Sequence, residues 1–317
     1  MNRILIIIFG VLHLLAGGMS QVQADSTTNI VSIQNEQILV RIKLLGAELN
    51  SIYSKRNDLE YLWQGSEESW KKQAPILFPI AGRLKPEEIR IDGRPCSIPQ
   101  HGFARDQTFE LLEQSKTRVL LQLRDNPDTR AIFPRTFILQ VVYGLSANHL
   151  SIAYQVKNPG KKSLPFILGS HPGFNCPLEP SLSFSDYYLQ FDQPENATRI
   201  KFRGGVISEE LPNYTQGKTR MLLYPDGLKG AIFLKELQSK TVTLKSDRSP
   251  REVRVQINNF PVVGFWTLNP QAGFFCIEPW LNPLAPPDFH GEFSERPGVI
   301  NLPPGQSWSS DLAISIK

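Results

Sequence analysis

Short apolar-patterned runs alternate with stretches rich in Gly, Pro, Asn and Asp along nearly the whole chain. Several runs place an apolar residue at every second position, the period of a β-strand that buries one face. Residues 146–149 separate two of these runs and predict the turn of a hairpin. The runs from which we expect strands are 119–123, 137–143, 150–156, 241–244, 252–257 and 312–316.

Helical patterns are scarce. Outside the N-terminal segment, no capped stretch of a dozen residues has apolar positions at i, i+3, i+4 and i+7, and residues 66–73 predict one or two helical turns at most. Many short strands without alternating helices favour an antiparallel sandwich or barrel. No repeat, linker or low-complexity block divides residues 25–317. The sequence therefore predicts a single all-β domain with mostly antiparallel strands.

The first residues follow a different pattern. An Arg precedes an apolar segment from Ile4 to about Ala16, and small residues lead up to Asp25. This is the pattern of a secretory signal peptide, so we expect residues 1–24 to be removed and the protein to be exported to the periplasm or the medium. The alternative is an uncleaved membrane anchor, but the apolar core is shorter than the ~20 residues that a spanning helix needs.

Composition narrows the possible partners. The 317 residues are 41% hydrophobic and 20% charged, which allows a large core, and the net charge of +4 is too weak to suggest a nucleic-acid partner. An exported chain with three cysteines can close one internal disulfide at most. We interpret Cys96, Cys176 and Cys276 as buried apolar residues. The sequence leaves their pairing and the oligomeric state open.

Glu278 lies in an unusual context for a carboxylate. It follows the apolar run 273–277, which predicts a buried strand, and it precedes Pro279. Burying an ionised carboxylate without a partner costs several kcal/mol. We therefore expect Glu278 to be paired, protonated or placed at the mouth of a pocket.

Three further polar residues lie in apolar or turn-forming stretches: Arg83, His101 and His171. The stretch GSHPGFNCPL around His171 predicts a change of chain direction after an apolar run. Taken singly, each of these residues is more often structural than functional. His101, His171, His290 and Glu278 could supply metal ligands, but no short ligand spacing is present, and no phosphate-binding glycine loop occurs. We therefore expect neither a metal nor a cofactor.

Four motifs in order carry more information than any one of them: PILFPIAGRLK, QHGFARD, SHPGFNCPL and CIEPW. Together they resemble the aldose 1-epimerase (galactose mutarotase) family, most closely its LacX-type branch. The resemblance runs from about residue 30 to the C terminus. It implies a galactose-mutarotase-like β-supersandwich that binds a monosaccharide in an open cleft and uses no cofactor.

The family pattern also implies roles. Glu278 would be the base and His171 the acid of an anomer-interconverting enzyme, while Arg83 and His101 would bind the sugar. Trp280 would offer an apolar face to the sugar ring.

Two alternatives stay open. Where the family pattern has an Asp, this chain has Gly230, and the nearest acid is Asp226. The chain could therefore be a sugar-binding protein that keeps the fold without the activity. It could also be a hexose-6-phosphate 1-epimerase in which Arg83 and Arg105 bind the phosphate.

Overall fold

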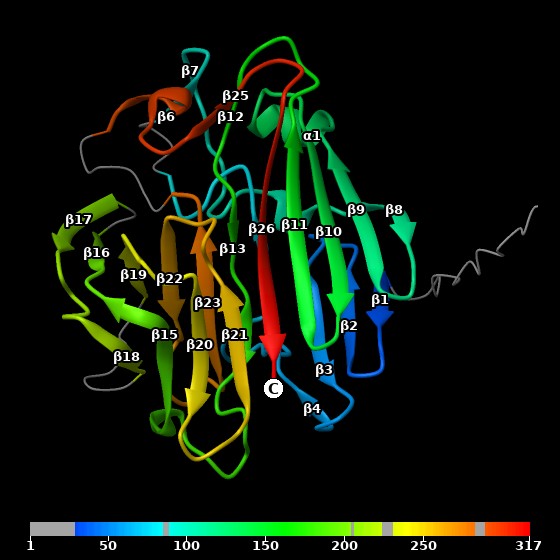
Figure 1. Cartoon of the computed structure of the whole chain (residues 1–317). Helices are drawn as coiled ribbons and strands as arrows, with labels where there is room; N and C mark the ends of the chain where they lie inside the picture. Colours follow the sequence, from blue (N-terminus) through cyan, green and yellow to red (C-terminus); the bar gives the residue numbers. More distant parts are fainter. Residues whose placement is uncertain (1–28, 85–88, 204–205, 224–230, 283–288) are drawn as a thin grey trace, which may run out of the picture.

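The computed structural model describes residues 29–84, 89–203, 206–223, 231–282 and 289–317 (Figure 1). The predicted signal peptide, residues 1–24, lies outside these ranges, as do Gly230 and Asp226. Within them, the strands form two large sheets and three small ones.

Nine of the described strands form the larger sheet, and neighbours pair antiparallel throughout. The C-terminal strand β26 lies in its interior, between β21 and β11 (Figure 1). In spatial order the strands are β18 (Lys218–Leu222), β15 (Tyr187–Glu195), β20 (Thr241–Ser246), β21 (Glu252–Gln256), β26 (Ser307–Ile316), β11 (His149–Lys157), β10 (Ile138–Ser146), β9 (Arg118–Arg124) and β8 (Glu110–Gln114).

Eight described strands form the second large sheet, again with antiparallel neighbours. In spatial order they are β17 (Val206–Leu211), β16 (Thr198–Arg203), β19 (Ile232–Lys235), β22 (Val262–Trp266), β23 (Phe274–Trp280), β13 (Gly169–Ser170) and β5 (Ile76–Leu77), while β14 (Gly173–Asn175) also pairs with β23.

The remaining described elements are short. One small sheet has the order β1 (Ile30–Gln34), β2 (Ile38–Lys43), β3 (Leu49–Ser54) and β4 (Leu59–Glu60). The others are the pair β12 (Leu164–Phe166) and β25 (Ile300–Leu302), and the sheet of β24 (Gly291–Glu292), β6 (Ile89–Ile91) and β7 (Arg94–Pro95), in which β24 and β6 are parallel. The helical segments are α1 (Pro127–Ile132), η1 (Ala104–Asp106), η2 (Phe184–Asp186) and η3 (Phe293–Glu295).

The predicted fold class is confirmed as an all-β, mostly antiparallel single domain, and each predicted strand is present. Residues 147 and 148 form the turn of the predicted hairpin, between β10 and β11. Of the one or two turns expected over 66–73, the structure has a single hydrogen-bonded turn, from the Ser69 N–H to the Ser66 carbonyl at 3.3 Å, and no helix. The sequence prediction also missed α1, whose six residues are too few for the helical period and which is capped by Asn126.

Strand β23 is buried on both faces, because all seven of its residues are buried. Phe275 and Ile277 belong to the hydrophobic core, whereas the alternate residues Cys276 and Glu278 face the other way. The three cysteines are buried, as expected, and none of them is paired, which the sequence had left open. No helix in the described part of the chain is long and apolar enough to cross a membrane.

Candidate active site

His171 lies directly across the sheet from Glu278. Gly169 pairs with Trp280 and Gly173 pairs with Cys276, so the chain between them runs antiparallel to β23 without a register shift. The same register places position 171 opposite position 278, where side chains point to the same face. Adjacent to the pair, Pro172 and Pro279 lack the N–H that a continuous ladder needs. The expected change of direction at His171 is therefore wrong: the ladder is interrupted, but the chain continues along β23.

The side chains of these two residues are in contact inside the protein. His171 Nε2 is 3.2 Å from Glu278 Oε2, and the residues are 8% and 2% exposed, respectively. His171 Nδ1 has no hydrogen-bond partner among the described residues. A carboxyl group and an imidazole are thus adjacent and largely shielded from water.

Burial sets the protonation of this pair. Loss of hydration raises the pKa of the Glu278 carboxyl well above its usual range. The same effect, together with nearby His101 and Arg105, lowers the pKa of the His171 imidazole well below its usual range. Around neutral pH the pair therefore holds one proton, which prefers Glu278 when the site is free.

We predict that the reaction rate depends on pH along a bell-shaped curve with a broad plateau around neutral pH. The one-proton pair is lost on the alkaline side as pH rises through the raised pKa of Glu278, and on the acid side as pH falls through the lowered pKa of His171. The rate of mutarotation, the reaction that the family resemblance implies, is measured across pH at constant ionic strength and corrected for the buffer rate. An optimum confined between the ordinary values of 4.5 and 6.5 would contradict it.

His101 adopts a backbone conformation that is uncommon for a side-chain-bearing residue, with φ of +67°. Its Nδ1 accepts a hydrogen bond of 3.1 Å from the Gly82 N–H. Burial, with Arg105 and Arg83 nearby, lowers its pKa to about 3, so the imidazole is neutral and carries its proton on Nε2. His101 Nε2 lies 3.2 Å from the Gln100 side-chain nitrogen, and the His101 ring is 5.6 Å from the His171 ring between centroids.

The next residue, Gly102, fixes this loop. It has φ of +74°, and a Cβ there would lie 2.0 Å from the Phe78 carbonyl oxygen, which accepts bonds from the N–H groups of Phe103 and Ala104. We predict that Gly102→Ala lowers the free energy of unfolding by about 3 kcal/mol, from backbone strain plus the clash. Urea denaturation measures the loss.

Gly93 offers a matched control for that substitution. It has nearly the same φ, +73°, but nothing lies within 4 Å of the Cβ position. Gly93→Ala should cost only the backbone strain, about 1 kcal/mol. Equal losses in the two variants would contradict the role assigned to the Phe78 contact.

A hollow of about 570 Å³ opens over the Glu278–His171 pair. It is lined by each of the six predicted site residues: Glu278, His171, Arg83, His101, Arg105 and Trp280. The structure brings them together; the role of each stays a prediction. Arg83 is exposed and donates to the Gln100 side chain at 3.0 Å. The Arg105 Nε and Trp280 Nε1 groups are buried and form no hydrogen bond among the described residues, although Arg105 Nε lies 3.6 Å from Asp106 Oδ2.

Four aromatic side chains that were not predicted from the sequence also line the hollow and form its aromatic walls: Trp70, Phe202, Phe233 and Trp266. Trp70 packs against His171 at 5.0 Å between ring centroids, and Trp266 packs against both. In the sequence these residues look like ordinary core positions. One sequence signal could have pointed to them: Trp266 alternates with core residues on β22, the strand that pairs with the Glu278 strand β23.

Of the possible metal ligands among the described residues, His171, Cys276 and Glu278 bring one atom each within 4.8 Å of one another. His101 and His290, which the sequence analysis had considered, are not in this group. Burial and the adjacent Glu278 raise the pKa of the Cys276 thiol well above its usual range, which opposes the thiolate that a metal requires. The donor set is therefore better suited to proton transfer than to metal binding.

Comparison with known proteins agrees with this geometry. The family model described as aldose 1-epimerase matches residues 29–315. The chain is 35% identical to the chromosomal LacX protein of Lactococcus lactis subsp. lactis over 296 residues, 90% of this chain and 99% of LacX.

Two solved structures are also similar. A galactose mutarotase related enzyme from Lactobacillus acidophilus has a TM-score of 0.86 at 30% identity, covering 91% of this chain and 97% of its own. A galactose mutarotase-like protein from Lactobacillus casei has a TM-score of 0.82 at 29% identity, covering 91% and 100%.

Proposed function

This chain belongs to the aldose 1-epimerase family, and from that premise we propose that it is an enzyme that interconverts the α and β anomers of a free aldose. The observation that carries the proposal is the contact of 3.2 Å between Glu278 and His171 inside the hollow. The anomeric hydroxyl oxygen O1 and the ring oxygen O5 of an aldose are bonded to the same carbon. A base and an acid this close can reach both oxygens at once.

In the proposed reaction the Glu278 carboxylate takes the proton of the O1 hydroxyl, and the His171 imidazolium gives a proton to O5. The C1–O5 bond breaks, and the C1–O1 bond becomes the carbonyl of the open-chain aldehyde. After rotation about C1–C2, O5 attacks the other face of C1, returns its proton to His171, and O1 regains its proton from Glu278. The pair holds one proton at every stage.

The electrostatics of the site suit this transfer. A raised pKa makes ionised Glu278 a stronger base, and a lowered pKa makes protonated His171 a stronger acid. In the free site the proton rests on Glu278, which is the arrangement of the open-chain stage. The closed sugar reacts from the other arrangement, in which Glu278 is ionised and His171 is protonated, and from there both proton transfers are favourable.

The remaining polar groups would hold the sugar. The neutral His101 imidazole lies beside His171 in the lining of the hollow, and the Arg105 guanidinium can stabilise negative charge on O5 as the ring opens. Trp280 is 2% exposed and packs against His101 at 5.5 Å between ring centroids, so it lines the hollow and supports His101.

Polarimetry tests the proposal. Freshly dissolved α-D-glucose and α-D-galactose, with a panel of other aldoses, should reach their equilibrium rotation faster in the presence of the protein. No acceleration with any of them would overturn the proposal. Saturable binding by calorimetry with unchanged mutarotation would instead favour a sugar-binding protein.

A second candidate, a hexose-6-phosphate 1-epimerase, has one observation in its favour. Two guanidinium groups, of Arg83 and Arg105, line the described hollow, and Glu278 is the only carboxylate in that lining. The planar, charged guanidinium group of arginine can donate two parallel hydrogen bonds to a phosphate group. A kcat/KM for glucose 6-phosphate at least tenfold above that for glucose would establish this candidate instead.

We also propose that the protein acts outside the cytoplasm, because residues 1–24 have the pattern of a signal peptide. Cell fractionation and the N-terminal residue of the mature protein test this. Recovery of the intact chain in the cytoplasmic fraction would overturn it.

A further inference from the structure

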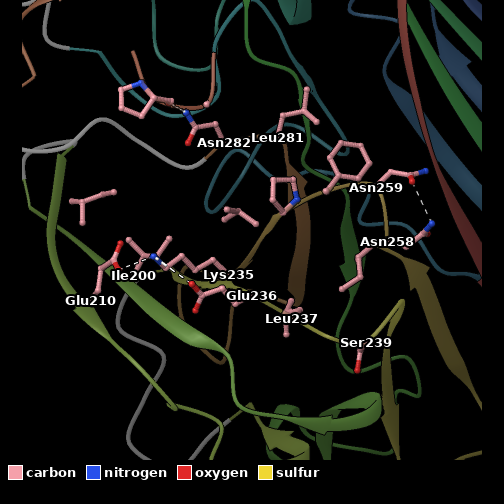
Figure 2. A pocket seen from close by; sticks show the side chains of 17 residues that line it. Ile200, Glu210, Lys235, Glu236, Leu237, Ser239, Asn258, Asn259, Leu281 and Asn282 are labelled. Carbon is pink, nitrogen blue, oxygen red and sulfur yellow. Dashed lines mark hydrogen bonds and ion pairs between the residues drawn. The ribbon is translucent and has the colours of Figure 1, made fainter. Parts of the chain in front are cut away.

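A second hollow, of about 670 Å³, lies beside the candidate active site and has no part in the proposed reaction. Figure 2 shows Lys235 and Glu236 near its middle, Glu210 on one side, and Asn258 and Asn259 on the other. Its floor and walls include Ile200, Val262 and Leu281.

Strand register places this hollow on the same sheet face as Glu278. Across the sheet, Glu278 pairs with Gly264, Gly264 with Phe233, Phe233 with Ile200, and Ile200 with Glu210. Directly paired residues point to the same face. One row of residues therefore runs from Glu278, across four neighbouring strand pairs, to the second hollow.

The adjacent row gives the same result. Trp280 pairs with Val262, and Val262 pairs with Lys235, so a wall of the first hollow and the floor of the second belong to one row. Between the hollows lies an aromatic ridge, which we define as Phe202, Phe233 and Trp280. Phe233 contacts the other two rings at centroid distances of 4.9 and 4.7 Å. Gly264 makes room for Phe233, because a Cβ there would lie 2.7 Å from its ring.

The chemistry of the second hollow suits hydroxyl groups above an apolar floor. Lys235 forms an ion pair of 2.7 Å with Glu210, and the exposed Asn258 side chain adds an amide. Carboxylate, ammonium and amide groups donate to and accept from hydroxyls, while the aliphatic floor and the aromatic ridge fit the C–H faces of a sugar ring.

We propose that the second hollow binds the next sugar unit of a reducing disaccharide or oligosaccharide whose reducing-end unit occupies the Glu278–His171 site. This inference rests on the proposed function. The two hollows lie on one sheet face, on either side of the aromatic ridge, so a substrate that fills the first and extends across the ridge enters the second. The reaction itself is unchanged, because only the reducing end has a free anomeric hydroxyl.

The test compares disaccharides with glucose in three variants. Asn258→Trp fills the hollow from an exposed position, and Lys235→Met removes the cation of the Lys235–Glu210 pair. The control is Lys201→Met, which removes the cation of the Lys201–Glu209 pair of 2.8 Å on the same two strands as Ile200 and Glu210 but on the opposite face. Mutarotation of α-maltose, β-cellobiose, β-lactose and α-D-glucose is followed by polarimetry.

We expect Asn258→Trp and Lys235→Met to lower kcat/KM five- to tenfold for at least one disaccharide, mainly through KM. Rates on glucose, and all rates of Lys201→Met, should change less than twofold. Unchanged or equal effects on glucose and all three disaccharides would overturn the second sugar site and leave the proposed epimerase intact.

If the wild type accelerates the mutarotation of none of these sugars, the proposed function fails. Calorimetry then tests by itself whether the second hollow binds a sugar unit. Tighter binding of a disaccharide than of glucose, lost in Asn258→Trp, would support the site. Equal affinities would overturn it.

Discussion

Replacing Glu278 by glutamine is expected to lower kcat for mutarotation by about 10²- to 10⁴-fold, the usual contribution of one general base. The amide has the shape of the carboxyl but cannot take the proton of the O1 hydroxyl. Because Glu278 is 2% exposed and its raised pKa favours the neutral form, a neutral amide should be tolerated and the protein should remain folded. Polarimetry gives the rate, and thermal unfolding gives the stability.

Glu195 provides the control for this substitution. It is also a fully buried carboxyl, but it accepts hydrogen bonds from the N–H groups of Gln238 and Ser239, and none of these three residues lines the 570 Å³ hollow. Glu195→Gln should lose stability by about 1–2 kcal/mol, because one acceptor becomes a donor, and should keep its kcat. Near-normal activity in Glu278→Gln, or equal loss in both variants, would remove Glu278 from the role of base.

The position of Glu278 could be predicted because its surroundings in sequence are extreme. A continuous apolar run that ends in a carboxylate and a proline predicts a buried strand, and the structure has the buried strand β23 there. The hairpin of β10 and β11 was predictable for the same reason, since period two and a polar turn are local signals. Both predictions depend only on neighbouring residues.

The partner of Glu278 could not be derived from local signals. His171 is 107 positions away, and the register that places it opposite Glu278 depends on two pairings, of Gly169 and of Gly173, that the sequence does not encode locally. The Gly and Pro around it were correctly seen as interruptions, but they interrupt a ladder and do not turn the chain. Only the ordered set of family motifs brought His171 and Glu278 together before the structure did.

The aromatic walls were missed for a related reason. Phe233 and Trp266 alternate with core residues on β19 and β22, so in sequence they resemble any strand buried on both faces. Which face borders a hollow depends on how the whole sheet is covered. Likewise, the positive φ of His101 has no sequence signal beyond the following glycine.

Replacing His171 by alanine should lower kcat at least tenfold, because His171 forms the ion pair with Glu278 in the hollow and is the proposed donor of the proton to O5. The space left by the imidazole opens onto the 570 Å³ hollow, so added imidazole can enter it. We therefore expect imidazole to restore part of the rate, after subtraction of its own catalysis in the absence of protein. A purely structural role for His171 would not respond to imidazole in this way.

Two controls make this rescue specific. Glu278→Gln lacks the base rather than the acid, so imidazole should not restore it, since His171 still fills the space. His149→Ala removes a half-buried imidazole on β11 that contacts only the Ser315 hydroxyl at 2.9 Å, and its rate should be close to that of the wild type. If His171→Ala keeps a near-normal rate, or if imidazole accelerates all three variants equally, the proton on O5 comes from another donor, and the pairing of His171 with Glu278 is structural.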